Sequence, residues 1–156
     1  MRPIKEFYWR RGLNNAASSK HLLINDNPKV TVLTTNQDLL ALVKKYFSQV
    51  DFVYFEDLKR PRQEMIKTFH LYRDDFNFKG EPKRFIPEPG NNHILLNLEQ
   101  NPANLSWYWY ARRYDIKVDL SGTYDDADLS ITNPNLSLEN QLVMLKDMLK
   151  VMTTNE

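Results

Sequence analysis

Two short apolar segments with a helical pattern between them dominate the first half of the chain. Residues 30–34, Val-Thr-Val-Leu-Thr, are apolar or β-branched throughout, which is typical of a buried strand. Within residues 39–47, apolar side chains recur every three to four positions, as on one face of an amphipathic helix. Residues 51–57 contain a second apolar run and predict another strand. The three segments together predict a β-α-β unit.

The second half of the chain predicts four further strands. They lie at residues 93–98, 105–111, 116–120 and 129–132. Apolar and polar residues alternate strictly in 116–120, as expected of a strand with one exposed face. Segment 105–111 is ambiguous, because the preceding Asn101-Pro102 is also typical of a helix start, but its Trp and Tyr residues favour a strand. Successive strands of this kind favour an antiparallel meander.

The chain ends in a predicted amphipathic helix. Its apolar positions follow a four-three-four-three spacing at Leu138, Leu142, Leu145, Leu149 and Met152. Burial of such side chains contributes roughly 1.5–3 kcal/mol each, which is enough to hold a helix against a sheet.

These elements predict an α+β fold with a mixed β-sheet. The sheet would combine the N-terminal β-α-β unit with a C-terminal antiparallel meander, covered by the C-terminal amphipathic helix. An α/β three-layer sandwich is the alternative. The 156 residues are expected to form a single domain, 1–156, with a basic N-terminal segment at 1–25 and a Pro- and Gly-rich loop at 73–91. Four apolar side chains should pin this loop to the body of the domain: Phe76, Phe78, Phe85 and Ile86.

The composition excludes several classes of function. The chain has no cysteine, so disulfides, thiolate nucleophiles, zinc knuckles and iron–sulfur clusters are excluded, and a reducing, cytoplasmic location is expected. No apolar run approaches the 18 or more residues of a membrane-spanning helix, and no membrane partner is expected. The four glycines are too dispersed for a phosphate-binding loop or a dinucleotide fingerprint. No cofactor is predicted.

Charge is distributed unevenly although the formal net charge is only +1. Residues 1–24 hold five Lys or Arg and one acid, and residues 59–89 hold eight Lys or Arg and five acids. Residues 115–156 hold three Lys and eight acids. Such segregation can orient the molecule towards a charged partner, or the two regions can complement each other within the fold.

One cluster of acids is the best candidate for metal binding. Asp125, Asp126 and Asp128 could supply carboxylate oxygens to a hard cation such as magnesium, which would fit a metal-dependent hydrolase. Aspartate is equally favoured in a solvated turn. The three histidines are isolated from one another in the sequence and form no metal-binding motif.

The most unusual feature is a combination of aromatic and basic residues that occurs twice. If residues 105–111 form a strand, one aromatic face should pack on the core and the other should be exposed beside arginine. In the alternative, helices cover one face and the loop of residues 59–90 covers the other. Tyr, Trp and Arg are enriched in binding hot spots, and aromatic platforms with basic flanks also stack unpaired bases. The leading hypothesis is therefore a non-catalytic protein-interaction module, such as a small regulatory, inhibitor- or immunity-type protein or a subunit of a larger assembly. Nucleic-acid binding is an alternative. The predicted contact residues are Trp107, Tyr108, Trp109, Tyr110, Arg112 and Arg113, together with Trp9, Arg10 and Arg11.

Overall fold

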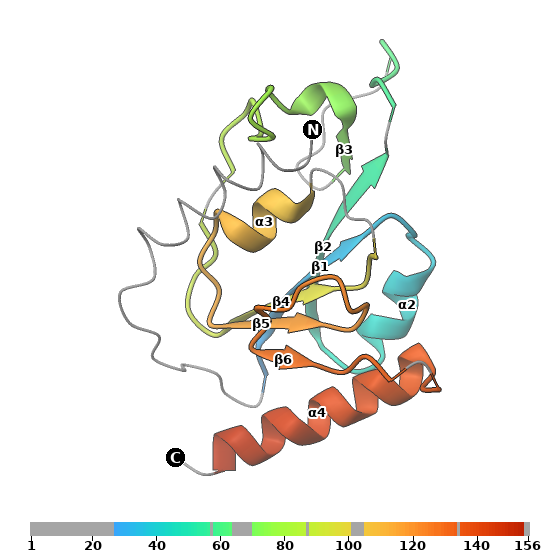
Figure 1. The fold of residues 1–156 in the computed structure, drawn as a ribbon, viewed down its shortest axis with the longest axis vertical. Helices are drawn as coiled ribbons and strands as arrows, with labels where there is room; N and C mark the ends of the chain where they lie inside the picture. The colour runs from blue at the N-terminus through green and yellow to red at the C-terminus, as the bar shows by residue number, and fades with distance from the viewer. Residues whose placement is uncertain are drawn as a thin grey trace.

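The computed structural model describes residues 27–56, 58–63, 70–86, 88–100, 105–133 and 135–154, without the side chains of the last three. These residues form one six-stranded sheet with helices on both faces (Figure 1).

Every strand pair in the sheet is parallel. The strands lie in the order β3-β2-β1-β4-β5-β6, so the chain builds the sheet outwards from β1, first to one side and then to the other. They are β1 (Lys29–Thr34), β2 (Gln49–Glu56), β3 (His70–Tyr72), β4 (His93–Asn97), β5 (Ile116–Asp119) and β6 (Leu129–Ser130). In the central register, Thr31 lies beside Asp51 of β2 and Leu95 of β4.

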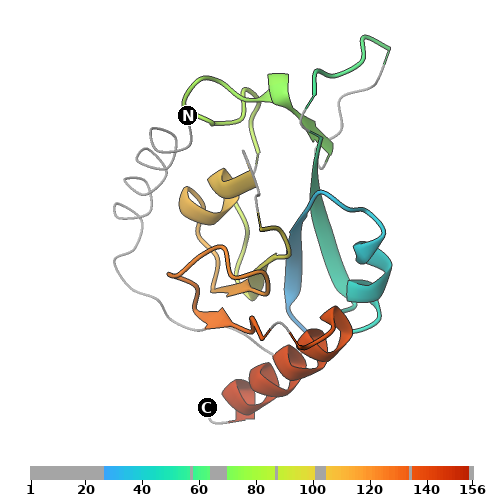
Figure 2. The ribbon, with the colours of Figure 1, turned by 45° about the vertical axis from the view of Figure 1, so that its right-hand side comes forward.

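Two apolar clusters occupy the two faces of the sheet. On one face, α2 (Leu39–Lys44) and α4 (Leu138–Thr154) pack on side chains such as Val32 and Ile94. On the other face, α3 (Ser106–Tyr110) packs on Leu33 and Leu95. Figure 2 shows the sheet between these helices. A 3₁₀ turn, η1 (Arg73–Asp75), follows β3.

The predicted C-terminal antiparallel meander is wrong. β4, β5 and β6 are parallel to one another and to β1. A parallel pair requires a connection that brings the chain back to the end where the first strand began. Between β4 and β5 that connection contains α3, and between β5 and β6 it is the loop of residues 120–128.

The error arises at residues 105–111, which were expected to form a strand and contain α3 instead. Leu105, Tyr108 and Trp109 have the three-to-four-residue spacing of a helix, and all three are buried. Burial of this face overrides the preference of Trp and Tyr for strands, a preference that depends strongly on context.

Two other sequence predictions are confirmed, namely the N-terminal β-α-β unit formed by β1, α2 and β2 and the C-terminal amphipathic helix. The arrangement agrees with the α/β three-layer alternative.

β5 differs from the prediction of an exposed face, because Lys117 and Asp119 are 4% and 0% exposed. Helices and loops on both faces of a parallel sheet bury the side chains of both faces.

Within the described residues, no helix is both long enough and apolar enough to span a bilayer.

Candidate functional site

The aromatic side chains of α3 lie inside the molecule. Tyr108, Trp109 and Tyr110 are 3%, 0% and 3% exposed, and Trp107 is half-buried. The prediction that one aromatic face is exposed is therefore wrong, and the rings are covered as in the alternative, because a helix directs them towards the sheet and the adjoining loops.

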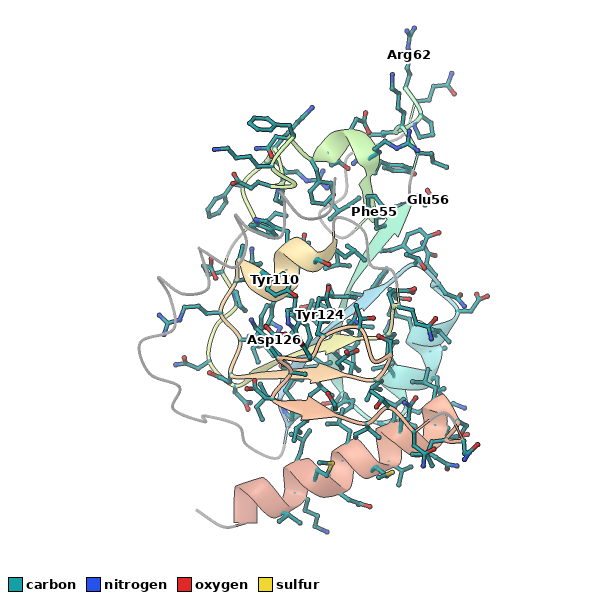
Figure 3. All side chains as sticks on the ribbon, viewed as in Figure 1. Phe55, Glu56, Arg62, Tyr110, Tyr124 and Asp126 are labelled. Carbon is teal, nitrogen blue, oxygen red and sulfur yellow. The ribbon has the colours of Figure 1, made fainter. Side chains whose placement is uncertain are left out.

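Trp109 is the centre of this aromatic cluster. Its indole ring stacks on Tyr124, with ring centroids 4.1 Å apart and planes inclined by 7°. The indole Nε1 donates a hydrogen bond of 3.0 Å to Asp126, and the Lys117 ammonium donates to the Trp109 carbonyl oxygen. Tyr110, Tyr124 and Asp126 gather beside α3 in Figure 3. These contacts assign the cluster a role in stability.

The two arginines that follow α3 have different environments. Arg112 is 4% exposed, and its guanidinium lies over the rings of Trp107 and Tyr108, 5.3 and 5.7 Å from the centroids. Its Nη1 donates a hydrogen bond of 3.1 Å to the Ile86 carbonyl oxygen. Arg113 is exposed. Of these two predicted contact residues, Arg113 is therefore accessible at the surface and Arg112 is not.

The three candidate metal ligands, Asp125, Asp126 and Asp128, have different environments. Asp125 is exposed, Asp126 accepts the bond from Trp109, and Asp128 Oδ2 accepts the backbone N–H of Lys117 at 2.8 Å. Across the part of the chain that the structure describes, no group of three or more His, Asp or Glu side chains is placed to hold a metal ion.

The three N-terminal members of the predicted contact set, Trp9, Arg10 and Arg11, lie outside the described residues, as does the whole basic segment 1–25. The role assigned to these residues stays a prediction.

Two phenylalanines on the loop after η1 are the most exposed large apolar side chains among the described residues. Phe78 is 76% exposed and Phe85 is 88% exposed. The sequence prediction that four apolar side chains pin this loop is only half correct. Phe76 is 6% exposed, and Ile86 packs against the apolar cluster beneath α3.

The backbone around Phe78 is held in a tight turn. Asn77 Oδ1 accepts hydrogen bonds from the backbone N–H groups of Lys79 and Glu81, at 2.9 and 3.0 Å. The backbone of Asn77 also bonds to that of Gly80 and Glu81. Gly80 has φ of 78°, a left-handed conformation that glycine adopts without steric cost. This network orders the backbone on both sides of Phe78.

An ionic network anchors the base of the loop. Asp75 Oδ2 accepts the backbone N–H of Tyr72 at 2.8 Å and pairs with the guanidinium of Arg60. Arg84 lies 4.0 Å from the same oxygen. The backbone N–H of Arg60 donates to Asp74, and this bond is the main reason that the pKa of Asp74 is lowered. Segment 58–63 is thus tied to the exposed loop.

We define the loop end as residues 58–63 together with 73–86. Figures 1 and 2 place it at the end of the molecule opposite α4. The sequence signal for it was the basic charge of residues 59–89, but no spacing rule separates the buried Phe76 from the exposed Phe78. The turn at Asn77 makes that difference, and it depends on hydrogen bonds within the folded loop.

Comparison of the chain with protein families, with curated proteins and with solved structures gave no match.

Proposed function

We propose that the chain is a non-catalytic protein-interaction module that binds an acidic partner protein through the loop end. The observation that carries this proposal is the exposure of Phe78 and Phe85, 76% and 88%, on a loop with a fixed backbone. Aromatic side chains are enriched in protein interfaces, where they fill pockets of the partner. Scattered exposed apolar residues need no explanation, but two large rings seven positions apart on one anchored loop supply a contact surface.

The ordered backbone of the loop supports tight binding of a partner even through a small interface. The Asn77 turn and the Asp75 network order the backbone before binding. Ordering a mobile loop at the moment of binding costs free energy, so a loop that is already ordered retains more of the contact energy.

The charge of the loop end supports an acidic partner. Lys59, Arg62, Arg73 and Lys83 are exposed there. Arg62 extends away from the body of the molecule in Figure 3. Complementary charge steers association and selects the partner.

The formal charge of the whole chain, +1, favours a protein partner over a nucleic acid, because binding to a phosphate backbone requires many cations. The absence of cysteine supports the cytoplasm as the compartment in which the interaction takes place.

The double substitution Phe78→Ser with Phe85→Ser tests the proposal. A matched control replaces two exposed apolar residues on α4, Val143→Ser with Met144→Ser, which are 40% and 42% exposed. Partners captured by the unaltered protein are purified, and their Kd is measured for each variant at low and high salt. We expect the loop variant to lose about tenfold or more in affinity, the control to keep its affinity, and binding to weaken as salt rises.

Three outcomes would overturn this function. The first is that no protein binds specifically, and the second is equal binding of a purified partner by both double variants. The third is capture of nucleic acid in place of protein, which would favour the nucleic-acid alternative.

A further inference from the structure

A cavity of about 580 Å³ lies on the α3 face of the sheet. It is bounded by the amino-terminal ends of β1, β2 and β4 and by residues 88–90. Its volume falls within the range of about 300–1,000 Å³ found for small-molecule sites. The cavity is distinct from the loop end proposed above as a protein-binding surface, and it meets that surface only near Ile86.

Arg112 contributes a buried cation to this cavity. The residue is 4% exposed and lines the cavity wall, and its Nε has no hydrogen-bond partner within the described part of the chain. Among those residues, no Asp or Glu forms an ion pair with it. A guanidinium has donors only, and a buried charge is costly unless an opposite charge and acceptor atoms accompany it. Tyr114 and the Ile86 carbonyl oxygen are hydrogen-bond partners of this guanidinium, but neither carries a negative charge, so an anionic oxygen would complete its environment.

His93 is a second polar residue of the same wall. It is 7% exposed, and its Nε2 lies 2.6 Å from Thr31 Oγ1. Nδ1 has no partner in the described residues. Burial lowers the pKa of His93, so the ring is neutral at pH 7 and adds no positive charge. Burial also raises the pKa of the neighbouring Tyr114 to about 12, which keeps its hydroxyl protonated.

The remainder of the wall limits what the anion can be. Val53, Ile86 and Tyr108 provide apolar surface, which suits an organic body larger than a bare inorganic ion. Asp51 and Glu88 also line the cavity and are exposed, and they balance the charges of Lys29 and Arg112 in the same wall. A wall without net positive charge disfavours a ligand with several negative charges.

We infer that this cavity binds a small organic monocarboxylate. Its carboxylate pairs with the guanidinium of Arg112, and its apolar body packs on Val53, Ile86 and Tyr108. Guanidinium and carboxylate groups match in geometry, and hydrogen bonds between charged groups are stronger than neutral ones.

Benzoate and hexanoate serve as probes, and each is compared with its neutral amide. Inorganic phosphate is tested as a competing anion. Calorimetry and nitrogen–proton NMR of the full chain measure the affinity and locate the site. We expect both acids to bind more tightly than their amides, and to shift the Arg112 Nε–H signal together with those of Thr31 and Gly90. Equal binding of acid and amide, tighter binding of phosphate, shifts confined to other regions, or no saturation up to about 10 mM would each overturn the inference.

Adjacent arginines provide the matched variants. Arg112→Gln removes the buried cation, whereas Arg113→Gln removes an exposed cation one residue away. We expect carboxylate affinity to fall about tenfold or more in R112Q and to change less than about twofold in R113Q. Equal effects of the two substitutions would contradict a specific role for Arg112. If R112Q does not fold, the comparison of each acid with its amide on the unaltered protein decides whether the cavity recognises a carboxylate.

Discussion

The ring of Trp109 lies parallel to the ring of Tyr124, 4.1 Å away between centroids, and the indole nitrogen donates to Asp126. The two contacts join α3 to the loop that connects β5 with β6. Both residues are buried, at 0% and 4% exposure. Among the described residues, α3 is the single helix on this face of the sheet. The aromatic stack and the hydrogen bond therefore hold it in place, in addition to its apolar contacts with β1 and β4.

Substitution of Trp109 by Phe tests this arrangement. The smaller ring leaves a void and removes the donor to Asp126, so we expect the free energy of unfolding to fall by about 2–3 kcal/mol. The same substitution at the half-buried Trp107 should cost less than half as much. Urea denaturation followed by far-ultraviolet circular dichroism measures both. Equal losses in the two variants would show that the stack does not stabilise the fold as described.

The sequence was informative where a local pattern determined the structure. The apolar run of β1, the helical spacing of α2 and the leucine spacing of α4 each predicted the element that forms. The same spacing is present at Leu105, Tyr108 and Trp109, but the adjacent aromatic residues favour a strand. A strand in place of α3 removes the crossover between β4 and β5, so the pattern predicts a meander where the sheet is parallel.

The candidate surfaces were less predictable because they depend on contacts between distant residues. His93 and Thr31 are 62 positions apart and meet only because β4 pairs with β1. The exposure of Phe78 follows from the Asn77 turn rather than from hydrophobic spacing. Alternation in β5 predicted an exposed polar face, but both faces of that strand are covered.

Asp119 provides a second prediction, since its buried carboxylate organises the loop after β5. Oδ1 accepts from Asn97 Nδ2 and from the backbone and side chain of Ser121, and Oδ2 accepts from the backbone of Tyr124 at 2.7 Å. Asp119→Asn replaces one acceptor oxygen by a donor that faces other donors. We expect a loss of about 2–3 kcal/mol in the free energy of unfolding.

Asp125→Asn is the control for this experiment, because Asp125 is exposed on the same loop. Its effect should stay within about 0.5 kcal/mol, as is usual for surface substitutions. Thermal and urea unfolding of the two variants measure the difference. Comparable stability of the two proteins would mean that the Asp119 carboxylate is not required to hold the loop.

The pH dependence of stability provides a third prediction, which rests on His93. Burial is the main cause that lowers its pKa below the ordinary value of 6.5. Lys29 and Arg112 act in the same direction, whereas Asp51 and Asp115 oppose them. The unfolded chain therefore binds a proton at this residue at a higher pH than the folded chain does. The contribution of His93 to stability is complete above about pH 6.5 and is lost as the pH falls through the folded pKa.

We accordingly expect the free energy of unfolding to decrease between pH 7.5 and pH 5, and to decrease less in His93→Gln, which cannot titrate there. Urea unfolding at a series of pH values compares the two slopes, and an NMR titration of the His93 ring gives the folded pKa directly. A folded pKa above 6.5, or identical slopes for the two proteins, would contradict a buried neutral imidazole at the cavity wall. A pKa below 6.5 with a steeper slope in the unaltered protein would agree with the geometry in which Thr31 and His93 share one hydrogen bond of 2.6 Å.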